Sequence, residues 1–158
     1  MRTLLISANT EPINMPIIPL GLGCLAGAVR RAGHEVELVD LMCVSDARSV
    51  IKDSIERFGP DVIGISVRNI DDQNIENPRF LLNQVRDVIA DCRMFSDARI
   101  VIGGAGYSIF PESALAYLAA DVGIQGEGEI AFPALLHAWK REPIFGAYQV
   151  FISQTEAE

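Results

Sequence analysis

The sequence is poor in the residues that build several common kinds of functional site. Its 158 residues contain two histidines, three cysteines and one tryptophan. The cysteines, Cys24, Cys43 and Cys92, are odd in number and far apart, which argues against a disulfide framework and against a thiolate metal site. We expect them to be small buried thiols in a reducing cytoplasm.

Positive charge and long apolar runs are also scarce. Lysine and arginine number 13 against 21 aspartates and glutamates, for a net charge of −8, and no stretch concentrates basic residues. Neither nucleic acid nor an anionic membrane is therefore an expected partner. No run approaches the roughly twenty apolar residues that span a bilayer, and residues 1–6 lack the apolar segment of a signal peptide. The sequence predicts a cytoplasmic domain.

Five short apolar runs alternate with five helical patterns along the chain. The runs fall at 3–7, 35–39, 61–67, 99–102 and 121–124, and the helical patterns at 20–32, 46–58, 78–94, 111–120 and 130–140. Such alternation predicts βαβ units with right-handed crossovers. We expect an α/β, flavodoxin-like three-layer sandwich whose five-stranded parallel sheet has the order 2-1-3-4-5. Residues 1–140 form this domain, and 141–158 form a tail or the start of a linker.

Four irregular segments follow the carboxyl ends of the expected strands, at 8–19, 68–77, 103–110 and 125–129. Ligands of open parallel sheets bind outside these ends, near the switch point of the strand order. The first segment carries three prolines and exceeds the usual βα connection of about two to six residues. Gly103 and Gly104 have no Cβ, so a flat ligand could lie against the backbone there. One crevice at this edge is predicted to bind a ligand.

The two histidines do not suggest a catalytic base. His34 is expected at the surface, on the side of the sheet opposite the crevice, and His137 is expected to be partly packed on the last helix. No carboxylate is placed to orient either ring. A phosphorelay receiver is excluded because Ser7 and Ser66 stand at strand ends where that site needs acidic residues.

What remains in the crevice is a set of glycines, small polar residues and backbone amides. Such a site suits a bulky cofactor that brings its own chemistry. A flavin or nucleotide binder on the same fold stays open as an alternative. The segment Asn9-Thr10-Glu11-Pro12 makes a poor phosphate loop, however, because the glutamate would repel the phosphate.

Five motifs in order support a more specific reading. They are Pro19-Leu-Gly-Leu-Gly-Cys-Leu-Ala, Gly33-His-Glu-Val, Pro60-Asp-Val-Ile-Gly-Ile-Ser, Ile102-Gly-Gly-Ala-Gly, and the stretch from Asp121 through Gly126-Glu-Gly-Glu to Phe132. Together they resemble the cobalamin-binding domain found at the N-terminus of many radical S-adenosylmethionine enzymes. The likeness covers residues 3–139.

The resemblance implies a corrinoid-binding module that is not catalytic alone. Its parent would be a radical S-adenosylmethionine enzyme, such as a methyltransferase or a magnesium-protoporphyrin ester cyclase-like protein. S-adenosylmethionine and an iron–sulfur cluster would belong to a catalytic domain in cis, because the family's Cys-x-x-x-Cys-x-x-Cys motif is absent from this sequence.

The resemblance also implies which residues contact the cofactor. They are Asn9, Pro19, Leu20, Ser66, Val67, Arg68, Asn69, Gly103, Gly104, Ala105, Ser108, Gly126, Glu127, Gly128 and Glu129. The loop after the first strand lacks the histidine that ligates cobalt in other B12 domains, so no histidine ligand is expected. Cobalt would face water or a side chain such as Arg68 or Asn69. Leucine at position 104 is expected to block the site and leave the fold intact.

A third hypothesis is a cofactor-free interaction domain. In that case the crevice would be filled by the protein's own side chains, for instance Tyr107, Phe110 and the segment around Met15.

Overall fold

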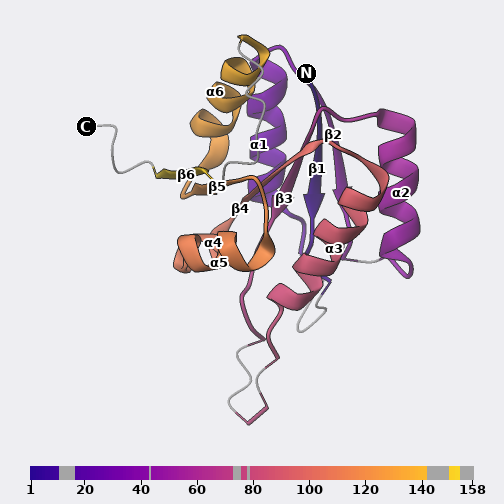
Figure 1. Cartoon of the computed structure of the whole chain (residues 1–158), viewed down its shortest axis with the longest axis vertical. Helices are drawn as coiled ribbons and strands as arrows, with labels where there is room; N and C mark the ends of the chain where they lie inside the picture. The colour runs from indigo at the N-terminus through magenta and orange to yellow at the C-terminus, as the bar shows by residue number, and fades with distance from the viewer. Residues whose placement is uncertain (11–16, 43, 73–75, 78, 142–149, 154–158) are drawn as a thin grey trace.

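The chain folds into a three-layer α/β sandwich around a parallel sheet (Figure 1). The computed structural model describes residues 1–10, 17–42, 44–72, 76–77, 79–141 and 150–153. The strands are β1 (Arg2–Ser7), β2 (Glu35–Asp40), β3 (Val62–Ser66), β4 (Arg99–Gly103), β5 (Val122–Gln125) and β6 (Val150–Ser153). Their order is β2-β1-β3-β4-β5-β6, so the predicted order of the first five strands is confirmed.

The sixth strand was not predicted. β6 pairs in parallel with β5 at the edge of the sheet, within the stretch expected to be a tail or the start of a linker. It has four residues, as β5 does, but it lies outside the alternation of apolar runs and helical patterns that marked the other strands.

Helices cover both faces of the sheet. On one face lie α1 (Leu20–Arg31) and α6 (Gly128–Arg141); on the other lie α2 (Ala47–Phe58), α3 (Leu82–Phe95), the short α4 (Ala105–Ile109) and α5 (Pro111–Leu118). Strand residues alternate between the two layers: Leu4 and Ile6 pack toward α2 and α3, and Leu5 packs toward α1 and α6. Because both faces are buried, the central strands are continuous apolar runs.

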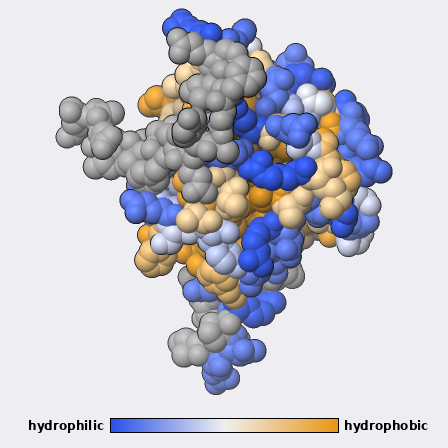
Figure 2. All heavy atoms as spheres, in the orientation of Figure 1, coloured by the Kyte–Doolittle hydropathy of each residue, from blue (hydrophilic) through white to orange (hydrophobic). Residues whose placement is uncertain are grey.

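The outer surface carries both hydrophilic and hydrophobic side chains. In the view of Figure 2, hydrophilic side chains dominate the right-hand side, over α2, and hydrophobic side chains lie over the middle of the face. In the part of the chain that the structure describes, no helix combines the length and apolarity needed to cross a bilayer.

Two helices differ from the sequence prediction. The third was expected from Pro78, which lies outside the described residues, but α3 begins at Leu82. Ahead of it, Asp71 and Phe80 form an antiparallel bridge. The carboxylate of Asp72 accepts hydrogen bonds from the backbone N–H and Nε of Arg79, at 2.9 and 2.8 Å. These contacts pair residues 71–72 with 79–80 ahead of α3. The second difference is α4, which lies within the stretch 103–110 that was expected to be a loop.

Candidate functional site

A cavity of about 650 Å³ lies at the carboxyl edge of the sheet, on the face covered by α1 and α6. Small-molecule sites span about 300 to 1,000 Å³, so this volume suits a ligand. Its lining comes from the ends of β1, β3, β4 and β5 and from the starts of α1 and α6. The four irregular segments predicted to meet at this edge each contribute residues to it.

The three central strands β1, β3 and β4 carry small residues at their last position on this face. Ser7 of β1 pairs with Ser66 of β3, and Ser66 pairs with Gly103 of β4. Two residues earlier on the same face, Leu5 and Val101 are buried in the core under α1 and α6. Between Leu5 and Val101, β3 contributes Gly64, which also lines the cavity. The space between the sheet and the two helices is therefore open over Gly64, Ser7, Ser66 and Gly103.

The walls of the cavity are apolar. Leu22 and Leu25 of α1, Ile124 of β5 and Phe132 of α6 line it. None of them was predicted as a site residue: Leu22, Leu25 and Phe132 have the helical spacing of an ordinary core face, and Ile124 belongs to an apolar run. Periodicity alone cannot separate a cavity wall from a packed core.

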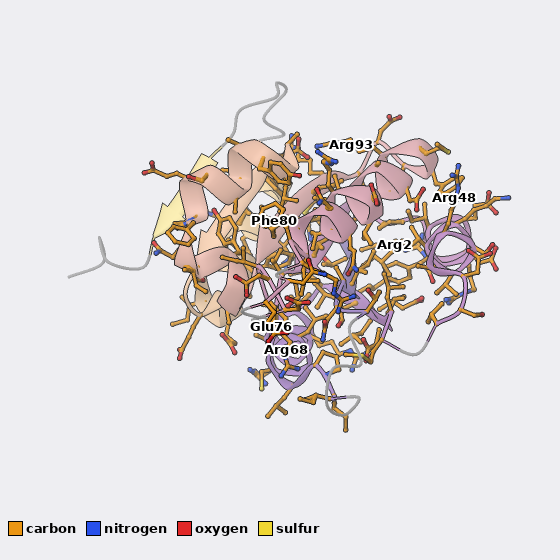
Figure 3. All side chains as sticks on the ribbon, turned by 90° about the horizontal axis from the view of Figure 1, so that it is seen from below. Arg2, Arg48, Arg68, Glu76, Phe80 and Arg93 are labelled. Atoms are coloured by element: carbon orange, nitrogen blue, oxygen red, sulfur yellow. The ribbon has the colours of Figure 1, made fainter. Side chains whose placement is uncertain are left out.

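Most of the predicted contact residues do line the cavity. They are Asn9, Pro19, Leu20, Ser66, Arg68, Gly103, Gly104, Ala105, Ser108, Gly126, Glu127, Gly128 and Glu129. Figure 3 looks onto this edge and shows Arg68 on the side of α1. Val67 and Asn69 are not part of the lining: the Val67 side chain is buried in the opposite face of the sheet, and Asn69 lines a separate cavity of about 10 Å³.

The backbone conformation and close packing at position 104 require a glycine. Its φ of +103° is a conformation that other residues rarely adopt, and a Cβ there would lie 2.7 Å from the carbonyl oxygen of Val67. The expectation that leucine at position 104 leaves the fold intact is therefore wrong. A side chain there would push β3 and β4 apart at their ends.

The histidines lie at the amino edge of the sheet. His34 directly precedes β2 and is 7% exposed, so the expected surface position is wrong. Its Nδ1 lies 3.3 Å from the N-terminal ammonium, and its Nε2 lies 3.4 Å from Nδ1 of His137. Burial lowers the pKa of His34, and the charges of the N-terminus, His137 and Lys140 lower it further. His137, expected to be partly packed, is exposed.

Neither histidine lines the cavity. Nδ1 of His137 also lies 2.9 Å from the carbonyl oxygen of Pro133, which holds the ring close to its own helix. Among the residues that the structure describes, no group of three or more histidines, cysteines, aspartates and glutamates is arranged to hold a metal ion.

The two aromatic side chains that the third hypothesis named do not fill the cavity. Tyr107 is fully buried in the core on the opposite face of the sheet, and Phe110 is 61% exposed; neither lines the cavity. Met15 lies outside the described residues.

The cysteines agree only in part with their expected burial. Cys92 is buried, and burial raises the pKa of its thiol to about 12. Cys24 is exposed on α1, where burial was expected. Cys43 lies outside the described residues.

Comparison with known proteins gives one family. The family model of the B12 binding domain matches residues 6–136. The tryptophan 2-C-methyltransferase of Streptomyces laurentii is 30% identical over 122 residues, which are 77% of this chain and 20% of that enzyme.

Solved structures point the same way. The radical S-adenosylmethionine methyltransferase TsrM from Kitasatospora setae, with cobalamin and a [4Fe-4S] cluster bound, superposes with a TM-score of 0.84 at 29% identity, over 89% of this chain and 24% of that one. The cobalamin-dependent radical enzyme OxsB, with aqua-cobalamin and S-adenosylmethionine bound, shares the fold with a TM-score of 0.66 at 23% identity, over 91% of this chain and 19% of that one. The chain thus spans about a fifth to a quarter of the length of these relatives.

Proposed function

The chain belongs to the B12-binding domain family, and we propose that it holds cobalamin at the carboxyl edge of its sheet as one module of a larger methyltransferase. The observation that carries this proposal is the cavity beyond the row of Ser7, Ser66 and Gly103. It lies at the switch point where open α/β sheets bind their ligands.

The residues around the cavity fit the cofactor chemically. The small row on the sheet and the apolar side chains of Leu22, Ile124 and Phe132 suit flat hydrophobic surfaces, such as the corrin or the base of its nucleotide tail. The carboxylates of Glu127 and Glu129 lie on the segment 126–129, here called the rim, and offer hydrogen-bond acceptors to the amide side chains of the corrin. When bound, cobalamin supplies a cobalt centre for methyl transfer or other radical chemistry. The residues of this chain bind and orient it.

A catalytic domain in cis would cover the mouth of the cavity. Large apolar side chains are exposed at this edge: Ile17 (46%), Ile18 (81%), Leu20 (74%), Ile109 (61%), Phe110 (61%) and Ile130 (79%). Clustered exposed apolar side chains are typical of interaction surfaces. The TsrM structure has cobalamin and a [4Fe-4S] cluster bound, and this chain covers 24% of the TsrM chain. We infer that the equivalent partner here is a radical S-adenosylmethionine domain of the same polypeptide.

We place the module in the cytoplasm. Cys24 and Cys92 are free thiols, and Cys24 is exposed. Free thiols are typical of reducing compartments.

The proposal is tested by titrating the protein with hydroxocobalamin, followed by visible absorption and equilibrium dialysis. We expect saturable binding with a changed cobalt spectrum, and no saturable binding of FMN in a parallel titration. Binding of FMN without binding of hydroxocobalamin would favour the flavin alternative and overturn the proposal.

A matched pair of glycines on α1 tests where the cofactor lies. A Cβ on Gly21 or on Gly23 meets nothing within 4 Å, so both positions accept a side chain, but only Gly21 lines the cavity. Gly21→Trp should weaken hydroxocobalamin binding by at least about tenfold, which is about 1.4 kcal/mol. Gly23→Trp is the control and should bind as the wild type does. Equal affinities in the two variants would place the cofactor elsewhere.

A further inference from the structure

The short helix α4 joins the loops around the cavity to one another. On one side it meets the end of β3, where the backbone N–H of Gly106 donates to the carbonyl oxygen of Val67 at 3.0 Å. The contact is tight, because a Cβ on Gly106 would lie 2.8 Å from the carbonyl carbon of Arg68. The turn after β4 is thus fixed against the segment that carries Arg68.

On its other side α4 meets the loop after β5 through Ser108. The hydroxyl of Ser108 donates to the carbonyl oxygen of Gly104 at 2.9 Å and accepts from the backbone N–H of Gly126 at 3.0 Å. The carbonyl oxygen of the same serine accepts from Nε2 of Gln125 at 3.2 Å. A single side chain therefore connects the turn after β4 with the rim that follows β5.

Gly128 and Glu129 of the rim are the first residues of α6, so Gly126 and Glu127 are the two rim residues that precede the helix. Gly126, with a φ of +81°, is where a contact from outside can restrict the chain ahead of α6. Glycine loses more conformational freedom on ordering than any other residue. The hydrogen bond from Gly126 to Ser108 restricts Gly126 and so the backbone that carries Glu127, which lines the cavity.

We propose that Ser108 is a positioning residue whose hydroxyl clasps Gly104 to Gly126 and so orders Gly126 and Glu127, the part of the rim ahead of α6, before the cofactor binds. A hydroxyl has one donor and two acceptor sites, and here the donor and one acceptor site are occupied by the backbone. The residue acts on the cofactor through the rim. Its effect on cobalamin rests on the proposed function, whereas the order of the rim in the free protein does not.

Amide exchange in the cofactor-free protein tests the clasp directly. Ser108→Ala removes the acceptor of the Gly126 N–H, and exchange at this amide should become about five- to tenfold faster, the factor for loss of one hydrogen bond. Ser108→Thr retains the hydroxyl and should restore slow exchange, because a helical threonine bonds readily to the carbonyl four residues earlier. Ser113→Ala, on the exposed face of α5, is the control and should leave exchange at Gly126 unchanged. Unchanged exchange in Ser108→Ala would overturn the proposal.

Dissociation of hydroxocobalamin gives the second readout. Ser108→Ala should release it about five- to tenfold faster, and Ser108→Thr should release it at the wild-type rate. Faster release without faster exchange at Gly126 would make Ser108 a direct cofactor contact and overturn the proposal. If the protein bound no hydroxocobalamin, the proposed function would fail, but amide exchange at Gly126 would still test whether Ser108 holds the rim in the free protein. If Ser108→Ala does not fold, Ser108→Cys replaces it, because a thiol is a weaker hydrogen-bond donor and acceptor than a hydroxyl. Exchange of the Gly126 amide in Ser108→Cys should then be faster than in the wild type and slower than in an unprotected amide. Exchange at the wild-type rate in that variant would contradict the clasp.

Discussion

The phenolic oxygen of Tyr107 lies where a β-carbon on Gly123 would have to be. Tyr107 belongs to α4 and is fully buried, and Gly123 is in the middle of β5. The ring can pack against the sheet only because residue 123 has no side chain. This contact holds α4 down on the sheet, and α4 in turn carries Ser108 and Ala105 at the cavity.

The first prediction concerns this contact. Gly123→Ala should destabilise the protein by about 1 to 3 kcal/mol, the usual cost of overpacking a core, because the added methyl displaces the tyrosine ring. Urea denaturation measures the change. Gly21→Ala is the control: its Cβ meets open space on α1, and alanine in a helix should stabilise by about 0.5 to 1 kcal/mol. Equal stability of the two variants would contradict the packing argument.

The hydroxyl of Tyr107 gives the second prediction. It is buried and has no hydrogen-bond partner among the described residues, and burial together with the charge of Glu112 raises the pKa of Tyr107 to about 12. Tyr107→Phe keeps the ring and removes the unpaired polar atom, whose burial costs about 1 to 3 kcal/mol. We expect a higher urea midpoint with an unchanged m-value. A lower midpoint would show that the hydroxyl is hydrogen-bonded in solution.

The fold and part of the site followed from local sequence signals. The five apolar runs predicted the central strands because each strand is buried on both faces, and the topology then brought the segments after Ser7, Ser66 and Gly103 to one edge. That placement needs no knowledge of side-chain packing. The segments that line the cavity could therefore be predicted by position. The individual contact residues came from the family resemblance, and Ser7, Gly21 and Gly64, which also line the cavity, were not among them.

The rest depended on contacts between distant parts of the chain. Leu22 and Leu25 have the spacing of core residues, and they line a cavity only because Ser7, Ser66 and Gly103 are small. The burial of His34 depends on α6, which brings His137 against it across 103 residues of sequence. α4 is five residues long, too short for helical periodicity to appear.

The third prediction concerns pH. The folded protein lowers the pKa of His34 from its ordinary value of 6.5, so the unfolded chain binds a proton at this site more readily. Stability from His34 is therefore fully present above about pH 6.5 and is lost as the pH falls through 6.5 toward the lower folded pKa. We expect His34→Gln to flatten the fall in Tm between pH 7 and pH 5. If Tm fell with pH equally in the variant and the wild type, the lowered pKa of His34 would be contradicted.

The fourth prediction concerns the thiols. Cys24 is exposed, whereas Cys92 is buried with its pKa raised to about 12, so almost none of the latter is the reactive thiolate at pH 8. In a Cys43→Ser background, a thiol reagent such as DTNB should label one cysteine rapidly and the second only after addition of denaturant. Two thiols that react at one rate in the native protein would show that Cys92 is accessible.

The last prediction concerns the cobalt of bound cobalamin. His34 and His137 contact each other at the amino edge of the sheet, and the cavity lies at the carboxyl edge, beyond Ser7 of β1. β1 has six residues, which at about 3.3 Å each span about 20 Å, far more than a cobalt–nitrogen bond.

The double variant His34→Ala/His137→Ala should therefore bind hydroxocobalamin with the absorption spectrum of the wild type. Its stability will fall because the His34 ring is buried, so the comparison is made at pH 7.5 and low temperature, with circular dichroism to verify the fold. Gly21→Trp serves as the variant whose binding does change. A shift of the cobalt spectrum in the folded double variant would mean that a histidine reaches the metal, which this arrangement of sheet and cavity does not permit.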